Sequence, residues 1–140
     1  MIVLDTNVIS ELMRPSPDAS VLRWMDRQPT RSIWTTAVTL YEVRAGLLSM
    51  PAGKRRTKLN GFFDQWLEQV LQRRVLSFDA DAAERTAELE AAGVKKGRTR
   101  EPRDTMIAGI VLASHARLAT RNVKHLEDIA SSVVNPWDKD

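Results

Sequence analysis

Three acidic residues stand where a carboxylate is unusual. Asp5 follows a short apolar run, and Glu42 and Asp104 fall within helical patterns whose neighbours are small or apolar. Burying a carboxylate is costly unless a partner neutralises it. Three carboxylates in one cleft repel one another, whereas a hard divalent cation such as Mg²⁺ or Mn²⁺ takes oxygen ligands and retains positions for water and phosphate. The pattern therefore favours a metal site, provided that the fold brings the acids together.

Each acid also has an ordinary structural explanation. Asp5 can be a polar residue leaving a strand, and Glu42 can extend to solvent from the edge of its apolar stripe. Asp104 can serve only to stabilise the first turn of a helix through the helix dipole. Ile107 and Ala108, three and four residues later, predict that Asp104 lies on the buried stripe of that helix.

Other metal chemistries and locations are less consistent with the composition. The chain has no cysteine and only two histidines, which excludes disulfides and a zinc site of the usual make-up. A reducing cytosol is the simplest environment for such a chain, so we expect a cytoplasmic protein. No apolar run approaches the ~18 residues of a membrane span, and no basic segment precedes the first apolar run as in a signal peptide.

The acids must be positioned by elements that alternate between strand and helix. We expect strands at residues 2–4, 32–36, 74–78, 117–120 and 132–135. We expect a first helix from residue 8, with Asn7 as its N-cap. Further helices are expected at residues 18–28, 37–50, 54–72, 79–92, 102–114 and 126–130. Gly93 would close the helix over residues 79–92 as a left-handed C-terminal glycine. Alternation of this kind predicts one domain with a parallel or mostly parallel sheet covered on both faces.

This arrangement brings two polar segments to one edge of the sheet. Asp5 follows the first strand and Asn122 follows the fourth, and in open α/β sheets ligands bind beyond the carboxyl ends of the strands. The three carboxylates and the Asn122 amide could therefore meet at this edge.

Basic residues are clustered although the net charge is only +3. The first group lies at residues 54–58, and the second contains Lys95, Lys96, Arg98, Arg100 and Arg103. Such groups suit a polyanion contacted through its phosphates. For so small a net charge, a solvated surface is the simpler explanation unless other evidence points to nucleic acid.

Four ordered segments resemble the motifs of PIN-domain nucleases. They are Leu4-Asp5-Thr6-Asn7, residues 39–46 around Glu42, Arg103-Asp104-Thr105-Met106-Ile107-Ala108, and Leu118-Ala119-Thr120-Arg121-Asn122. The later Val134-Asn135-Pro136-Trp137 is similar to the VapC and FitB-type branch of that family. The resemblance covers essentially the whole chain.

The resemblance implies a single PIN domain over residues 1–140. Its fold class would be α/β, a three-layer α/β/α sandwich around a mostly parallel five-stranded sheet. It implies a Mg²⁺- or Mn²⁺-dependent endoribonuclease that acts as the toxin of a type II toxin–antitoxin system. The implied partners are RNA, a small DNA-binding antitoxin that occludes the site, and a second copy of the chain in a homodimer.

The resemblance also assigns roles to residues. Asp5, Glu42 and Asp104 would be catalytic and would carry the metal, with Thr6 supporting Asp5, and the basic residues from Lys95 to Arg103 would hold RNA. One position departs from the family, which commonly has a fourth acid where this chain has Asn122. An amide oxygen can coordinate a cation or hold a water, but it adds no negative charge.

Two rival functions follow from particular residues. Asp5-Thr6-Asn7 partly resembles the start of a haloacid-dehalogenase-like phosphatase with Asp5 as nucleophile, but that class places a second acid at position 7. Asn122 instead suits a catalytically weak PIN-fold RNA- or protein-binding domain. Metal-dependent cleavage of RNA separates the nuclease from this second rival, and a trapped phospho-aspartate would identify the phosphatase.

Overall fold

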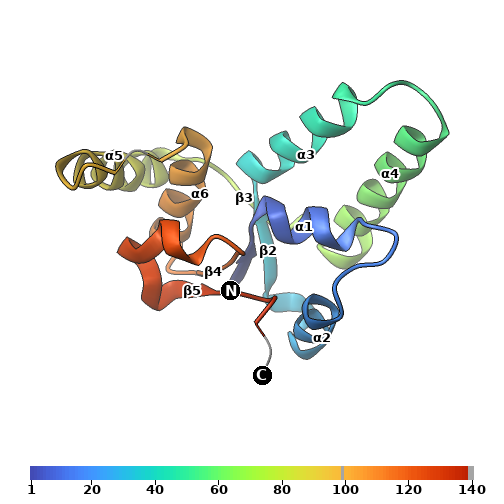
Figure 1. Ribbon diagram of the computed structural model, residues 1–140, viewed down its shortest axis with the longest axis horizontal. Coiled ribbons are helices and arrows are strands. Elements are labelled where there is room, and N and C mark those ends of the chain that lie inside the picture. Colours follow the sequence, from blue (N-terminus) through green and yellow to red (C-terminus); the bar gives the residue numbers. More distant parts are fainter. Residues whose placement is uncertain (99, 139–140) are drawn as a thin grey trace.

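The computed structural model describes residues 1–98 and 100–138 and contains a five-stranded parallel sheet between helices (Figure 1). The sheet has the order β3-β2-β1-β4-β5, and its strands are β1 (Ile2–Leu4), β2 (Ile33–Thr36), β3 (Val75–Leu76), β4 (Arg117–Ala119) and β5 (Val133–Val134). The α-helices are α1 (Thr6–Leu12), α2 (Ala19–Arg27), α3 (Ala37–Ser49), α4 (Lys54–Gln65), α5 (Ala80–Lys95) and α6 (Pro102–Ala113). The expected α/β class and mostly parallel five-stranded sheet are confirmed.

Shorter helical segments complete the chain. They are the 3₁₀ segments η1 (Thr30–Ser32) and η3 (Val123–Ser132) and the π-helical turn η2 (Trp66–Val70). Within the described residues, no helix is both long enough and apolar enough to span a membrane.

Strand β1 lies at the centre of the sheet and fixes where Asp5 emerges. Ile2 is paired with Ile33 of β2 on one side, and Leu4 is paired with Ala119 of β4 on the other. Val3 and Leu4 are completely buried, as expected for a strand covered on both faces. Asp5 therefore leaves the middle of the carboxyl edge, between the ends of two neighbouring strands.

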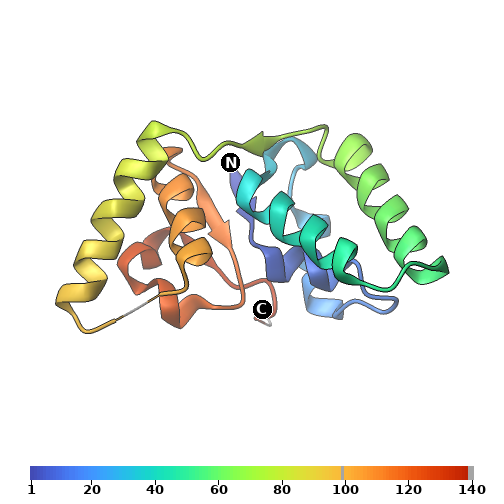
Figure 2. The same cartoon turned by 90° about the horizontal axis from the view of Figure 1, so that it is seen from above.

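Two hydrophobic cores lie on opposite faces of the sheet. Ile2 and Leu4 belong to the first core, together with apolar residues of α1, α2, α3 and the α4–η2 segment. Val3, which points the other way, belongs to the second core with α5, α6 and η3. Figure 2 shows α5 and α6 on one side of the sheet and α3 and α4 on the other. The layers are thus those of the expected three-layer sandwich.

Helix α6 is held against α5 through a close approach at Gly109. A Cβ atom built on Gly109 would lie 1.9 Å from Oγ1 of Thr86 and 2.8 Å from the carbonyl oxygen of Ala82. Oγ1 of Thr86 donates to that same carbonyl, at 2.7 Å. Only glycine permits this approach, and the contact sets the position of the helix that carries Asp104.

Three helix ends differ from the sequence-based expectation. Helix α1 begins at Thr6 and Asp5 is its N-cap, because Asp5 is still extended and its own carboxylate accepts from the Thr6 amide. The helix expected over residues 54–72 ends at Gln65 and continues as the π-helical turn η2. Helix α5 runs through Gly93, and the left-handed glycine is Gly97, with φ 69°.

Candidate active site

Asp5 is a buried carboxylate held by donors from three positions. Its Oδ1 accepts from the backbone amide of Thr6 at 2.8 Å, and its Oδ2 accepts from Oγ1 of Thr120 at 2.7 Å. The Asn7 amide approaches the same Oδ2 at 3.5 Å. Burial raises the pKa of Asp5, the hydrogen bonds from Thr120 and Thr6 act in the opposite direction, and the charge of Glu42 adds to the rise. The side chain is therefore oriented, and its ionised form is only partly compensated.

Glu42 is positioned by α3 and by the hydroxyl of Thr6. The Thr39 amide donates to Oγ1 of the N-cap Thr36 at 3.0 Å, which fixes the start of α3. One turn later, Oε1 of Glu42 accepts from Oγ1 of Thr6 at 2.7 Å. The Glu42 side chain is 19% exposed, so it is paired at the cleft wall rather than extended into solvent.

Asp104 reaches the same cleft from the opposite side. It lies in the first turn of α6, whose N-cap Glu101 accepts from the backbone amides of Arg103 and Asp104. The expectation that Asp104 lies on a buried stripe is wrong: Ile107 and Ala108 are buried, whereas Asp104 is exposed. Asp104 lies one turn before Ile107 and Ala108 on the same helix face. Its side chain is beyond the edge of the core and borders the cleft.

Electrostatic repulsion between the acids is already present at Asp104. Its pKa is raised, first by desolvation and then by the negative charges of Asp5, Glu101 and Glu42, while His125 lowers it. Carboxylates from three separate elements therefore influence one another across the cleft.

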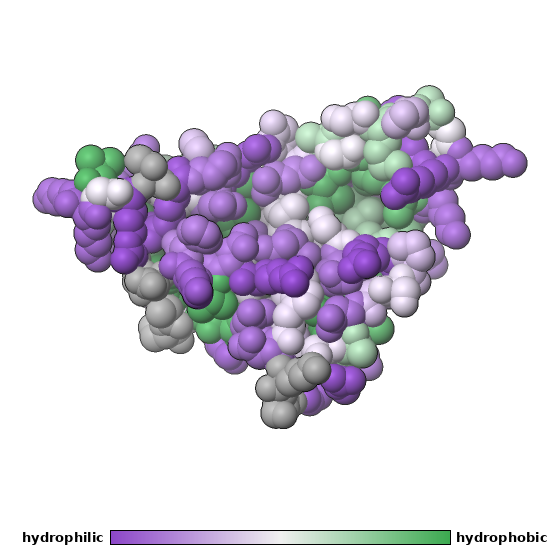
Figure 3. All heavy atoms as spheres, in the orientation of Figure 1, coloured by the Kyte–Doolittle hydropathy of each residue, from purple (hydrophilic) through white to green (hydrophobic). Residues whose placement is uncertain are grey.

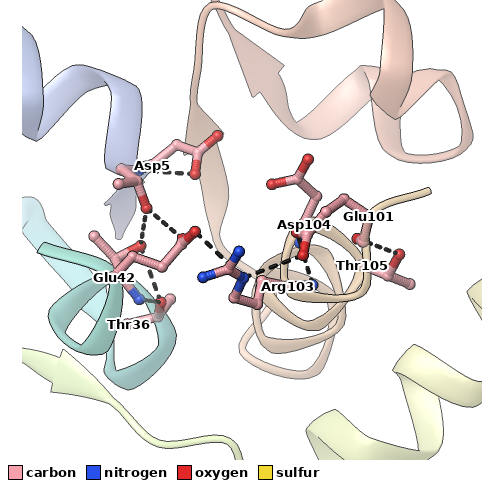
Figure 4. A network of polar contacts seen from close by, with 9 residues as sticks. Asp5, Thr36, Glu42, Glu101, Arg103, Asp104 and Thr105 are labelled. Carbon is pink, nitrogen blue, oxygen red and sulfur yellow. Dashed lines mark hydrogen bonds and ion pairs between the residues drawn. The ribbon is translucent and has the colours of Figure 1, made fainter. Parts of the chain in front are cut away.

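Arg103 lies between the two sides of the cleft, as Figure 4 shows. Its Nε is 3.1 Å from Oε1 of Glu101 and 3.7 Å from Oε2 of Glu42. Its guanidinium also lies over the ring of Tyr41, 6.0 Å from the centroid. Sequence reasoning assigned Arg103 to RNA but did not predict this contact with an acid of the site.

A cleft of about 530 Å³ joins these groups. Its lining includes all five residues assigned to catalysis, metal or support: Asp5, Thr6, Glu42, Asp104 and Asn122. Asn122 contributes from the turn after β4, where its backbone amide donates to Oγ1 of Thr120 at 3.1 Å. The structure thus brings the predicted set to one cleft, at the carboxyl edge of the sheet.

Some residues that line the cleft, or that hold its acids from behind, were not singled out from the sequence. The hydroxyl of Thr120 bonds Asp5, although only its position at the end of the fourth strand pointed to it. Arg121 lines the cleft with its guanidinium 5.1 Å from the ring centroid of Trp137. The terminal Val-Asn-Pro-Trp motif was the only sequence signal for that tryptophan.

The basic residues predicted to bind RNA do not gather in one cleft as the acids do. Lys95 ends α5, and Lys96 is its C-cap. Arg100 donates from Nε to the carbonyl oxygen of His125 at 2.8 Å and lines a second pocket, of about 290 Å³, that Asp104 shares. Arg98 lines a smaller pocket beside the end of α5. Of the five, Arg103 is the one in contact with Glu42.

The donor set suits a hard cation. Asp5, Glu42 and Asp104 offer carboxylate oxygens, and Asn122 offers an amide oxygen. Desolvation, and after it the charges of the neighbouring acids, raises the pKa of Asp5 and of Asp104, so a bound cation would stabilise both ionised groups. Within residues 1–98 and 100–138, no three acidic or histidine side chains converge closely enough to form a complete metal-binding group. Asp5, Glu42 and Asp104 line one cleft without forming such a group, and a cation bound there would take its remaining ligands from water and phosphate oxygens.

Asp5 follows the carboxyl end of β1, and Glu42 and Asp104 lie on α3 and α6 beside this parallel sheet. Residues 2–131 match the family model of the PIN domain. The chain belongs to the PIN domain family.

Full-length relatives place the chain near the VapC and FitB proteins. It is 41% identical to "VapC ribonuclease Y4jK" of Sinorhizobium fredii, covering 99% of both chains. It is 31% identical to "Toxin FitB" of Neisseria gonorrhoeae, covering 98% of this chain and 99% of that one. The solved structure "FitAB bound to IR36 DNA fragment" contains a chain that superposes with a TM-score of 0.91 at 30% identity, over 100% of this chain and 98% of the other.

Proposed function

We propose that this protein is a Mg²⁺- or Mn²⁺-dependent endoribonuclease and the toxin of a type II toxin–antitoxin pair. The observation that carries the proposal is the convergence of Asp5, Glu42 and Asp104, from three elements, on one solvent-accessible cleft. The relatives support it, since one carries the name VapC ribonuclease and another the name toxin.

Asp5, Glu42 and Asp104 would hold the cation, with the Asn122 amide as a neutral fourth group. When bound, a divalent cation supplies charge stabilisation at the scissile phosphate and a lowered pKa for water. Thr6 fixes Glu42 through the 2.7 Å hydrogen bond to Oε1, so that Oε2, which the Thr6 hydroxyl does not contact, can orient the attacking water. Attack on phosphorus with departure of the 3′-oxygen leaves a 5′-phosphate and a 3′-hydroxyl.

The basic residues would hold the RNA on either side of the cut bond. Arg100 lines the pocket that Asp104 shares, and Arg103 pairs with Glu42, which lines the acid cleft, so both would contact the nearest phosphates. Lys95, Lys96 and Arg98 lie farther along, at the end of α5 and after it, and would contact more distant phosphates. This contribution should weaken as salt concentration rises.

A second, larger groove suits the antitoxin. It has a volume of about 660 Å³, and its walls carry the apolar residues Leu12, Met13, Val43, Leu47, Leu59 and Phe62, with Arg14, Arg55 and Lys58 beside them. In Figure 3, hydrophobic side chains gather at the upper right, over α3 and α4. Thr6 and Glu42 line this groove and the acid cleft alike, so a segment bound here would cover the active site. We also propose that two copies of this chain form a homodimer.

Two observations favour the alternative of a catalytically weak RNA- or protein-binding domain. The fourth polar group is the neutral Asn122, and the described acids do not form a closed metal group. In that case the cleft would still bind RNA or protein, but without hydrolysis.

Cleavage of a structured RNA with Mn²⁺ separates the two functions. We expect wild type to cut in Mn²⁺ and not in chelator, and Asp104→Asn to lose about 10²-fold or more of the rate, because the exposed carboxylate is a direct cation ligand. Asp26→Asn, an exposed acid-to-amide change on α2, is the matched control and should cut normally. Circular dichroism would verify that both variants fold. Equal cleavage by folded Asp104→Asn would contradict the assignment.

A further inference from the structure

Arg103 is placed as an internal counterion of the acid cleft. Its Nε is shared between Glu101, at 3.1 Å, and Glu42, at 3.7 Å. Both carboxylates otherwise have defined bonds, since Glu101 caps α6 and Oε1 of Glu42 accepts from Thr6. The guanidinium therefore forms an ion pair with Oε2 of Glu42, the oxygen that the Thr6 hydroxyl does not contact.

The contact is loose enough to exchange. The Arg103 side chain is 44% exposed, and an ion pair at 3.7 Å with this exposure contributes little stability. The exposed Tyr41 ring, whose centroid is 6.0 Å from the guanidinium, offers Arg103 a second partner through a cation–π contact. A cation that approaches Oε2 of Glu42 must displace Arg103 or tolerate its repulsion.

Once displaced, Arg103 is still adjacent to the reacting region, because it directly precedes Asp104 in the chain. A guanidinium binds phosphate with two parallel hydrogen bonds, which its contact with a single carboxylate oxygen of Glu42 does not use.

Resting on the proposed function, we propose that Arg103 is a positioning residue that exchanges one partner for another. In the metal-free protein it neutralises Glu42 and competes with the divalent cation. When the cation enters, the Arg103 side chain leaves Glu42 and its guanidinium binds a phosphodiester of the bound RNA. Arg103 thus couples cation entry to substrate binding. In the metal-free cleft it limits the repulsion among the acids, and in the loaded cleft it becomes a substrate contact.

The test is a calorimetric Mn²⁺ titration without RNA. Arg103→Gln should bind Mn²⁺ about threefold more tightly than wild type, since the competing charge is removed. Arg103→Lys keeps the charge and should stay close to wild type. Arg121→Gln is the matched control, because Arg121 lines the same cleft but stacks on Trp137 instead of pairing with an acid. It should change the affinity by less than about 1.5-fold, since charges of this kind are screened.

RNA binding provides the second readout, with the opposite sign. Binding of a short single-stranded RNA is followed by fluorescence anisotropy in Ca²⁺ at several salt concentrations, and the RNA is checked for integrity afterwards. Arg103→Gln should weaken binding and reduce the salt slope by about one phosphate contact. A residue that only supported the fold would not tighten one ligand while weakening the other.

The outcomes are distinguishable. If wild type and Arg103→Gln bind Mn²⁺ equally, or the variant binds it more weakly, the inference about Arg103 is overturned and the proposed nuclease is unaffected. If wild type itself binds no Mn²⁺, the proposed metal dependence fails and this inference fails with it. Tighter Mn²⁺ binding together with weaker RNA binding supports the exchange.

Discussion

The two walls of the acid cleft are built in different ways. The fixed wall, formed by Asp5, Thr6 and Glu42, is tied together by hydrogen bonds of 2.7–2.8 Å and connected to the sheet through Thr120. The open wall, formed by Glu101, Arg103 and Asp104, lies in and just before the first turn of α6, with its side chains exposed. One wall is oriented before any ligand arrives, and the other can adjust to it.

The difference has a physical origin. Asp5 follows the central strand directly, so the packing of β1 determines its position. Asp104 depends on how α6 sits on α5, and no hydrogen bond from another element fixes its carboxylate among those the structure describes. A rigid wall can orient water and cation, while an adjustable wall can accommodate a bulky polymer. Three substitutions test this division, from the largest expected effect to the smallest.

Gly109→Ala should damage the support of the open wall. The added methyl would overlap Oγ1 of Thr86, and the helices would have to separate. We expect a loss of about 3 kcal/mol in the free energy of unfolding, as for overpacked cores. Gly61→Ala on α4, where nothing lies within 4 Å of the new Cβ, should instead stabilise the protein by about 0.5–1 kcal/mol. Urea denaturation measures both, and equal midpoints would refute the close approach.

Thr6→Val should loosen the fixed wall with little effect on folding. Valine keeps the shape of threonine but cannot donate to Oε1 of Glu42. Losing a hydrogen bond that orients a metal-binding carboxylate should lower the Mn²⁺-dependent cleavage rate about tenfold or more. Thr6→Ser retains the hydroxyl and should keep most of the activity. A serine variant as slow as the valine variant would show that the hydroxyl is not what matters.

The smallest effect concerns pH in the metal-free protein. The folded-state pKa values of Asp5 and Asp104 are raised, so the folded protein binds these protons more tightly than the unfolded chain. This tighter proton binding adds to the free energy of unfolding at low pH. The added stability is lost as the pH rises from the ordinary carboxyl pKa range through the raised folded-state pKa values. In chelator at pH 7, Asp104→Asn should therefore raise stability, by less than about 1 kcal/mol because the group is exposed.

Thermal melts between pH 4 and pH 8 test this expectation. The Asp104→Asn curve should flatten relative to wild type, and Asp26→Asn should leave the curve unchanged. Mg²⁺ should raise the wild-type melting temperature at neutral pH by mass action. A melting temperature insensitive to both Mg²⁺ and Asp104→Asn would mean that the carboxylates do not repel one another.

The sequence was most informative where local pattern and burial coincide. The uninterrupted apolar run of Ile2, Val3 and Leu4 predicted a central strand, and the structure has it there. Because Asp5 follows that strand without a linker, its place at the carboxyl edge was predictable as well. The convergence of Glu42 and Asp104 on the same cleft required the ordered motifs, since helical periodicity alone left both with structural explanations.

Side-chain partners and helix ends were less predictable. Helix α5 continues through Gly93, and the chain that follows the helix turns back over this residue: the carbonyl oxygen of Arg98 lies 2.9 Å from where a Cβ on Gly93 would stand. The approach of Arg103 to Glu42 joins residues 61 positions apart, and only the packing of α3 and α6 brings it about. Local propensity carries no information on this ion pair.

The strand order also has a consequence for protein synthesis. Strand β1 is translated first, but its partner β4 is made more than a hundred residues later, with Ile2 paired to Arg117 and Asp5 bonded to Thr120. A nascent chain that has not passed residue 120 cannot assemble the cleft, whatever its earlier helices do. A ribosome that stops early would release a fragment carrying Asp5 and Glu42 without the strand that holds them in place. For a protein proposed to cut RNA in the cell that makes it, the topology itself defers activity until residues 117–120 have been synthesised.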